Sequence, residues 1–288
     1  MDIKRNRKFD SASPEYGSID VFLQEPIIPS GNGCVYYGGL PIDFFLEDAG
    51  QNTLLILLQG SVTARSRFPW TRQPSYLHDI GSHATVMLSD PTLYLDNSLT
   101  TAWFAGNRHQ PQLQQVATKL IAKIAANVEG RKLVFVGGAA ASFSALYFSA
   151  KFPLSTAVVF NPCTNIARFP AYTVNNWLYK SWEVESLCDL PSHVTVDLDS
   201  LYRGNVTNRV FYIQHPNNHR KITDELPFLG QIRPLRNCCF VTEEDLGGDQ
   251  NIEDAVRSEF VRLAMSTPFG SIVDGLEFIG MNDLLALN

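Results

Sequence analysis

The sequence predicts an α/β fold, a three-layer sandwich in which helices cover both faces of a mostly parallel, eight-stranded sheet, with a small cap. Two observations lead to this prediction. Several short runs are continuously apolar, most clearly residues 53–58 and 156–160, as is typical of strands that are buried on both faces. Helical patterns alternate with these runs along the chain, and such alternation favours parallel strands joined by helices.

Further apolar runs place the remaining strands. Two or three edge strands are expected within 19–23 and 33–46, with a turn at Gly38 and Gly39. The other strands are expected at 84–88, 133–136, 210–213 and 238–241.

Residues 113–128 are predicted to form an amphipathic helix. Their apolar members recur at the spacing of one buried helix face, and Gly130 follows as a usual terminator. These members are Leu113, Val116, Leu120, Ile121, Ile124 and Val128. A closing helix is expected at 252–265. Its inward-facing residues are predicted to be Val256, Phe260 and Leu263.

A single main domain is predicted at residues 19–265, preceded by a flexible arm at 1–18. Residues 168–207 interrupt the alternation of strands and helices with mixed polarity and two tryptophans, and they are expected to form the cap. Residues 266–288 are apolar enough to dock, either on their own domain or as a homodimer contact.

The composition excludes several classes of protein. A net charge of −6 argues against nucleic acids and anionic membranes as partners. No apolar run approaches the roughly 20 residues that span a bilayer, and the basic N-terminus lacks the apolar stretch of a signal peptide, which favours a cytoplasmic protein.

Neither a metal nor another cofactor is expected. The five cysteines are odd in number and form no CxxC pair, which favours buried free thiols over a metal site. The pair Gly137 and Gly138 follows a predicted strand, but it lacks the third glycine of a Rossmann fingerprint. It also lacks the Gly-Lys-Ser/Thr of a phosphate loop, which argues against nucleotide binding.

The most informative segment is 132–143, which reads as an apolar strand, a tight turn of small residues and a helix. This is the context of the Gly-x-Ser-x-Gly nucleophile elbow, a strained strand-to-helix turn that holds a catalytic side chain above a sheet. The five residues here are Gly137-Gly138-Ala139-Ala140-Ala141. A methyl group therefore occupies the position of the serine hydroxyl.

Four other segments strengthen this comparison. They read Leu58-Gln59-Gly60-Ser61, Ser89-Asp90-Pro91-Thr92-Leu93, Ala102-Trp103-Phe104-Ala105-Gly106 and Asn161-Pro162-Cys163-Thr164. Together with the elbow, they resemble motifs of the α/β-hydrolase superfamily, and in particular of a bacterial group within it. The resemblance implies a site beyond the carboxyl ends of the central strands, where several loops converge.

Carried over position by position, the resemblance implies a triad in which no member has the required side chain. The nucleophile position is Ala139. The acid position is Asn218, with Asn217 as the alternative, and the base position is Gln250, or Asp249 if the loop is one residue shorter. An asparagine cannot stabilise an imidazolium as an aspartate does, and a glutamine cannot transfer a proton.

The backbone part of the site is expected to persist. In this fold, the amides of Ala140 and of the loop at Gly60 and Ser61 are expected to form an oxyanion-type nest. Cys163 and Trp177 are added as pocket residues, with a packed thiol and cap packing as the alternative interpretations.

Other polar residues have structural explanations beside catalytic ones. Ser142 and Ser144 follow the elbow, but Ser142 lies nearly one turn into the helix, where capping is the expected role. His219 stands beside the acid position, either as a catalytic substitute or as a surface histidine. Asp249 is either a general base in different chemistry or a turn residue.

Three functions remain open from the sequence. The first is a hydrolase-fold protein without a working triad that binds a small molecule, peptide or carbohydrate, or catalyses a non-hydrolytic reaction such as isomerisation or epimerisation. The second is a serine esterase, deacylase or acyltransferase that is inactivated because Ala139 replaces the nucleophile. The third is a structural subunit of a complex, with the tail at 266–288 as its contact.

Overall fold

The computed structural model describes residues 13–50, 52–63, 69–78, 80–81, 83–128, 132–204, 206–214, 228, 230, 238–242 and 254–267. Contacts between residues group the chain into two compact units. The first comprises residues 1–72, 82–131 and 166–196, and the second comprises 73–81, 132–165 and 197–288. The predicted cap at 168–207 is therefore shared between the units, and the predicted arm and tail remain predictions.

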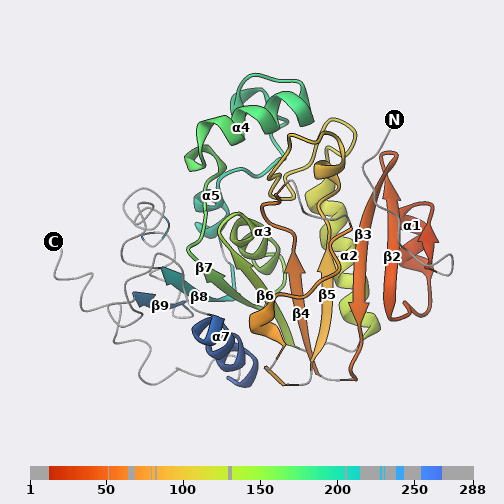
Figure 1. The fold of residues 1–288 in the computed structure, drawn as a ribbon, viewed down its shortest axis with the longest axis vertical. Helices are drawn as coiled ribbons and strands as arrows, with labels where there is room; N and C mark the ends of the chain where they lie inside the picture. Colours follow the sequence, from red (N-terminus) through yellow and green to blue (C-terminus); the bar gives the residue numbers. More distant parts are fainter. Residues whose placement is uncertain are drawn as a thin grey trace. The chain divides into compact units, whose positions relative to one another are not determined.

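The first unit contains strands in the order β1-β2-β3-β5-β4 (Figure 1). They are β1 (Glu15–Tyr16), β2 (Gly31–Tyr37), β3 (Leu40–Glu47), β4 (Thr53–Leu58) and β5 (Ala84–Leu88). β2–β3 and β3–β5 pair antiparallel, whereas β1–β2 and β4–β5 pair parallel. Gly38 and Gly39 join β2 to β3 with φ angles of 57° and 77°, as a two-residue hairpin turn with positive φ at both positions requires. The predicted turn is thus confirmed.

Two predictions concern the helices of the first unit, and one of them is confirmed while the other is wrong. They are α1 (Ile19–Gln24), α2 (Leu113–Asn127), α4 (Ala171–Trp177), the π-helical turn η4 (Leu178–Trp182), and the 3-10 turns η2 (Pro91–Tyr94), η3 (Ile166–Arg168) and η5 (Leu187–Asp189). Every apolar position of the predicted stripe at 113–128 is buried, and the last of them, Val128, is the C-cap of α2. The edge strand expected at 19–23 is wrong, because Ser18 caps α1 by accepting a hydrogen bond from the Val21 N–H at 3.2 Å.

The second unit contains four parallel strands in the order β6-β7-β8-β9. They are β6 (Lys132–Gly138), β7 (Thr156–Phe160), β8 (Arg209–Gln214) and β9 (Cys238–Thr242). Its helices are η1 (Ser75–Leu77), α3 (Ala140–Ser149), α5 (Leu198–Tyr202) and α7 (Asp254–Ser266). α3 packs along β6 and β7, as Figure 1 shows. Lys132 holds the end of α7 against β6, since its Nζ donates to the carbonyl oxygens of Met265 and Thr267 at 2.6 Å each.

The predicted stripe of α7 is wrong in its details. Val256, Phe260 and Leu263 are only half-buried, whereas Val261 and Ala264 are fully buried. Arg257 lies on the same face as these two, with its guanidinium 5.5 Å from the ring centre of Tyr76 and 5.8 Å from that of Phe160. Because an arginine stacked on aromatic rings belongs to the inward face, a purely apolar pattern selects the wrong stripe.

The predicted fold class is confirmed. The first unit contributes β2 to β5 and the second contributes β6 to β9, which makes eight mostly parallel strands of mixed pairing with helices, and β1 adds a two-residue strand. In the described part of the chain, no helix combines the length and the apolar character that crossing a membrane requires.

Candidate functional site

The turn between β6 and α3 has the backbone geometry of a nucleophile elbow. Ala139 stands between Gly138, which ends β6, and Ala140, which begins α3, with φ of 48° and ψ of −116°. Residues with a Cβ rarely adopt a positive φ, and such strain gathers at functional positions. Ala139 is exposed, and its N–H donates to the carbonyl oxygen of Phe160 at 2.9 Å. This hydrogen bond fixes the turn to the end of β7.

Two glycines precede Ala139, and only one of them is required by packing. A Cβ on Gly137 would lie 2.6 Å from the carbonyl oxygen of Ala141, because α3 starts directly against the end of β6. A Cβ on Gly138 would have no atom nearer than 3.7 Å. The close approach of helix and strand therefore depends on Gly137.

The hydroxyl of Ser142 is already used inside the fold. It accepts a hydrogen bond from the Cys163 N–H at 2.8 Å and donates to the carbonyl oxygen of Ala139. The predicted capping role is therefore wrong, because Ser142 instead links the elbow to the loop after β7. Cys163 is buried, and its Sγ lies 3.4 Å from the carbonyl oxygen of Asn165. This arrangement agrees with a packed thiol.

The ends of β7 and β8 carry polar side chains that contact each other. Asn161 directly follows β7 with φ of 45°, and its N–H donates to the carbonyl oxygen of Ile213 at 2.8 Å. The Nε2 of Gln214 lies 3.3 Å from the Oδ1 of Asn161. Because β6, β7 and β8 are parallel, Ala139, Asn161 and Gln214 lie at the same carboxyl edge. This is the edge at which open α/β sheets bind ligands.

The other predicted pocket residues belong to the first unit. Gly60 is half-buried and Ser61 is exposed. The hydroxyl of Ser61 lies 2.8 Å from that of Thr101. Trp177 is fully buried and packs edge to face against Trp103, with 5.5 Å between ring centres. The structure thus brings Ala139, Ala140 and Cys163 together in the second unit. Their grouping with Gly60, Ser61 and Trp177 in one pocket remains a prediction.

The predicted acid and base positions lie outside the described residues. These positions are Asn217 and Asn218, together with His219, and Asp249 and Gln250. Their roles therefore remain predictions. Within the described ranges, no three His, Cys, Asp or Glu side chains are grouped to hold a metal ion. Cys34 and Cys163 are buried free thiols as expected, whereas Cys188 is exposed.

A buried aspartate that the sequence did not reveal joins two of the quoted motifs. The side chain of Asp90 accepts hydrogen bonds from the N–H of Phe104 at 2.6 Å and from the N–H of Thr92 at 3.0 Å. Its own N–H donates to the Oε1 of Gln59 at 3.0 Å. Burial raises the pKa of Asp90 to about 6, although these hydrogen bonds act in the opposite direction. Segments 89–93 and 102–106 thus meet at one carboxyl group.

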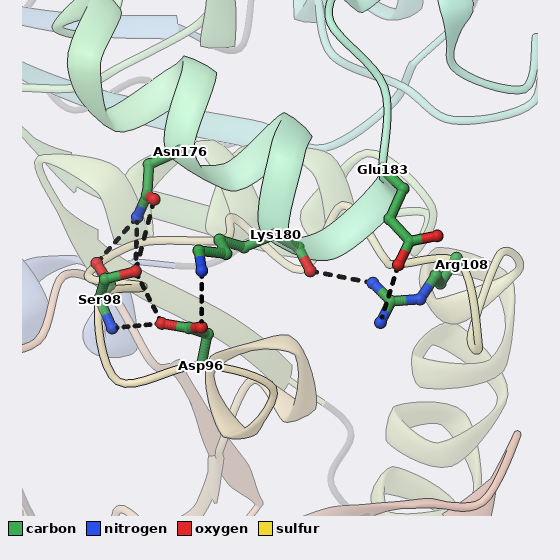
Figure 2. A network of polar contacts seen from close by, with 6 residues as sticks. All are labelled: Asp96, Ser98, Arg108, Asn176, Lys180 and Glu183. Carbon is green, nitrogen blue, oxygen red and sulfur yellow. Dashed lines mark hydrogen bonds and ion pairs between the residues drawn. The ribbon is translucent and has the colours of Figure 1, made fainter.

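The helical segment 171–183 is tied to the loop 96–108 by polar contacts at its exposed side (Figure 2). Lys180 Nζ pairs with Asp96 at 3.0 Å, and Asn176 Nδ2 donates to the carbonyl oxygen of Ser98 at 2.9 Å. Arg108 donates to the carbonyl oxygen of Lys180 at 3.0 Å and pairs with Glu183 at 3.4 Å. Hydrogen bonds from Ser98, with the nearby Lys180, lower the pKa of Asp96 to about 2.

Among the comparisons with known proteins, the one with solved structures bears on the fold. No protein-family model matches the chain, and no curated protein matches it in sequence. The capsule O-acetyltransferase of Neisseria meningitidis serogroup A is 12% identical, with a TM-score of 0.59 over 80% of this chain and 95% of that one. The Gap123 glycosylation-associated complex of Streptococcus agalactiae contains a similar chain, 13% identical, with a TM-score of 0.56 over 81% of this chain and 46% of that one.

A third similar structure is EstE1, a thermostable carboxylesterase from a metagenomic library. It is 11% identical, with a TM-score of 0.52 over 85% of this chain and 90% of that one. The structural neighbours thus include esterases and an O-acetyltransferase of the α/β-hydrolase fold, and a variant of the meningococcal enzyme has been solved with CoA. At such identities the likeness establishes the fold.

Proposed function

We propose that the protein is a hydrolase-fold protein without a nucleophile at its elbow, which binds a ligand or catalyses a non-hydrolytic reaction at the carboxyl edge of its sheet. The observation that carries the proposal is Ala139. It has the strained, exposed backbone of an elbow residue, yet its methyl group can neither attack a carbonyl nor exchange a proton. A fold that keeps the strain without the hydroxyl supports a use other than acyl-enzyme formation.

The neighbouring hydroxyl and thiol groups support the same conclusion. Ser142 is buried, and its hydroxyl both donates and accepts a hydrogen bond within the fold. Cys163 is buried beside it, and an activated cysteine requires an accessible thiol with a cationic or basic partner. Neither side chain is placed to replace the missing serine.

The proposed chemistry uses backbone amides. The N–H groups of Ala140 and Ala141 begin α3 directly after the elbow, where a helix offers no acceptor four residues earlier, whereas the N–H of Ser142 donates to the carbonyl oxygen of Ala139 at 3.2 Å. Such amides stabilise a carbonyl oxygen or an enolate oxygen. A proton abstraction beside a carbonyl would then need a base, for which Asp249 and His219 are the candidates in the sequence.

The test restores the missing hydroxyl. Ala139→Ser is treated with a fluorophosphonate probe and assayed with p-nitrophenyl acetate, beside the wild-type protein and Ala139→Gly as controls without a hydroxyl. The proposal expects labelling and ester hydrolysis at the wild-type background level, because a serine without an imidazole is a weak nucleophile. Thermal unfolding curves of all three proteins ensure that each is folded.

The second candidate function is an inactivated acyltransferase or esterase. The likeness to a capsule O-acetyltransferase and to EstE1 favours it. Stoichiometric labelling of Ala139→Ser, with ester hydrolysis well above both controls, would establish this candidate and reject the first.

A further inference from the structure

Three buried tryptophans lie where the loop 102–110 meets the segment 171–183 of the first unit. Trp103, Trp177 and Trp182 are 2%, 0% and 7% exposed. Trp103 packs edge to face against Trp177. Trp182 faces the loop, since a Cβ on Gly106 would lie 3.3 Å from its ring. Residues 103, 177 and 182, with the neighbouring Ser181, are called the tryptophan cluster below.

The polar side-chain atoms of this cluster have no hydrogen-bond partners among the residues that the structure describes. The indole Nε1 of all three tryptophans and the hydroxyl of Ser181 are buried, and each is unpaired. Buried polar groups in proteins are nearly always paired, because an unmade hydrogen bond costs the full desolvation of the group. An indole N–H can only donate. The missing partners of the tryptophans are therefore acceptors.

The segment 171–183 buries Trp177, Leu178 and Trp182, but its outer edge is held only by polar contacts, and its backbone is irregular. Its tethers to Asp96, Ser98 and Arg108 join side chains that are partly or fully exposed (Figure 2), and ion pairs in contact with solvent contribute little to stability. The turn 178–182 is π-helical, and Glu183 ends it with φ of 59°, both of which are features that gather at functional positions. The segment thus combines weak outer contacts with unpaired inner donors.

We propose that the tryptophan cluster is a binding site for a neutral oligosaccharide, which enters when the segment 171–183 moves away from the loop 102–110. Aromatic rings pack against the C–H faces of sugars, while sugar oxygens accept hydrogen bonds from indole N–H groups. The four side chains of the cluster carry no charge, which favours a neutral ligand over an anionic one. The site does not depend on the identity of residue 139.

The first experiment titrates the full chain with maltotetraose and with tetra-N-acetylchitotetraose, and follows tryptophan emission. We expect saturable binding of at least one of the two sugars. In Lys180→Met, which removes the ion pair with Asp96 and keeps the apolar stem, we expect binding to become severalfold tighter. The reason is that a larger open fraction raises the apparent affinity of a ligand that binds the open state.

The second experiment removes one donor without changing the ring's shape. Trp177 is replaced by β-(3-benzothienyl)alanine, in which sulfur stands in place of the indole N–H. Binding should weaken about tenfold, which corresponds to about 1.4 kcal/mol and one hydrogen bond. The matched control is the same replacement at Trp70, outside the cluster, which should leave binding unchanged.

Three results would overturn the proposal. The first is no binding of either sugar to the wild-type protein or to Lys180→Met at millimolar concentration, which would leave ordered water as the partner of the indoles. The second is equal binding after replacement of Trp177, and the third is weaker binding by Lys180→Met. Labelling of Ala139→Ser by a fluorophosphonate would reject the proposed function and leave these results untouched, so the two failures are distinguishable.

Discussion

The carboxyl group of Asp90 accepts a hydrogen bond from the backbone N–H of Phe104, with 2.6 Å between oxygen and nitrogen. Asp90 lies two residues after the end of β5. The hydrogen bond joins it to a loop in which Trp103 and Phe104 have φ angles of 56° and 51°. Two consecutive residues with positive φ are costly for side chains of this size. The hydrogen bond therefore stabilises a loop conformation that its own sequence does not favour.

Replacing this carboxyl group by an amide should destabilise the protein. In Asp90→Asn, one of the N–H groups of Thr92 and Phe104 faces an NH₂ group instead of an oxygen. We expect the free energy of unfolding at pH 7 to fall by about 1–3 kcal/mol, the cost of one unsatisfied buried donor. Urea unfolding of both proteins measures this difference, and an unchanged midpoint would contradict it.

The same residue predicts a pH dependence of stability. Burial raises the pKa of Asp90 from 3.8 to about 6, so the folded state binds this proton more tightly than the unfolded state does. The bound proton therefore stabilises the folded state by about 3 kcal/mol. This contribution is fully present below about pH 4 and is lost as the pH rises through 6. The difference in unfolding free energy between wild type and Asp90→Asn should therefore change across this window. If the unfolding free energies of the two proteins instead change in parallel with pH, Asp90 has its ordinary pKa in the folded state and the prediction is wrong.

The two glycines before the elbow should respond differently to alanine. In Gly137→Ala, the new methyl group meets the backbone carbonyl of Ala141, which cannot move without shifting α3. We expect a loss of about 3 kcal/mol or more, as for overpacking against a rigid neighbour. Gly138→Ala has room for its Cβ and should change stability by less than about 1 kcal/mol. Thermal unfolding measures the stability of both variants. An equal loss of stability in Gly137→Ala and Gly138→Ala would contradict the packing argument.

Glycine at the elbow should stabilise the fold. Ala139→Gly relieves the positive φ of 48°, and we expect a gain of about 1 kcal/mol after the larger entropy of the unfolded glycine is subtracted. Ala145→Gly, in the middle of α3, is the matched control and should lose at least about 1 kcal/mol. If both substitutions destabilise the protein, the elbow is not strained.

Lys132 should matter more than an ordinary surface lysine. Its Nζ donates to the carbonyl oxygens of Met265 and Thr267 at the end of α7. Lys132→Met keeps the stem and removes both hydrogen bonds, so we expect a loss of about 1–3 kcal/mol. Lys119→Met, at an exposed position of α2, should stay within about 0.5 kcal/mol of wild type. Chemical denaturation of the two variants measures the contrast.

The sequence was most informative where one local signal decides the structure. β4 and β7 begin and end where the continuous apolar runs 53–58 and 156–160 do, because strands covered on both faces tolerate few polar residues. The elbow was predictable because a run of small residues between a strand and a helix is typical of a sharp strand-to-helix turn. The helix α1 was missed although Ser18 is a readable cap, because the short apolar run after it was interpreted as a strand.

Contacts between distant residues explain the rest. Asp90 precedes a proline and resembles a turn residue, and its burial depends on Phe104, 14 positions later in the chain. The hydroxyl of Ser142 finds its partner at Cys163, 21 positions later. On α7, the inward position of Arg257 depends on Tyr76 and Phe160. No local pattern encodes such pairings, and the acid and base positions, outside the described residues, stay predictions.

The two-residue strand β1 has a consequence for solubility. Glu15 and Tyr16 pair with Cys34 and Val35 on the side of β2 opposite β3, and the hydroxyl of Tyr36 lies 3.4 Å from the carboxylate of Glu15. Open strand edges recruit strands from other molecules and so begin aggregation. The chain occupies part of this edge with its own backbone and places a negative charge there. We therefore expect the pairing of β1 with β2, together with the charge of Glu15, to oppose polymerisation through the edge of β2.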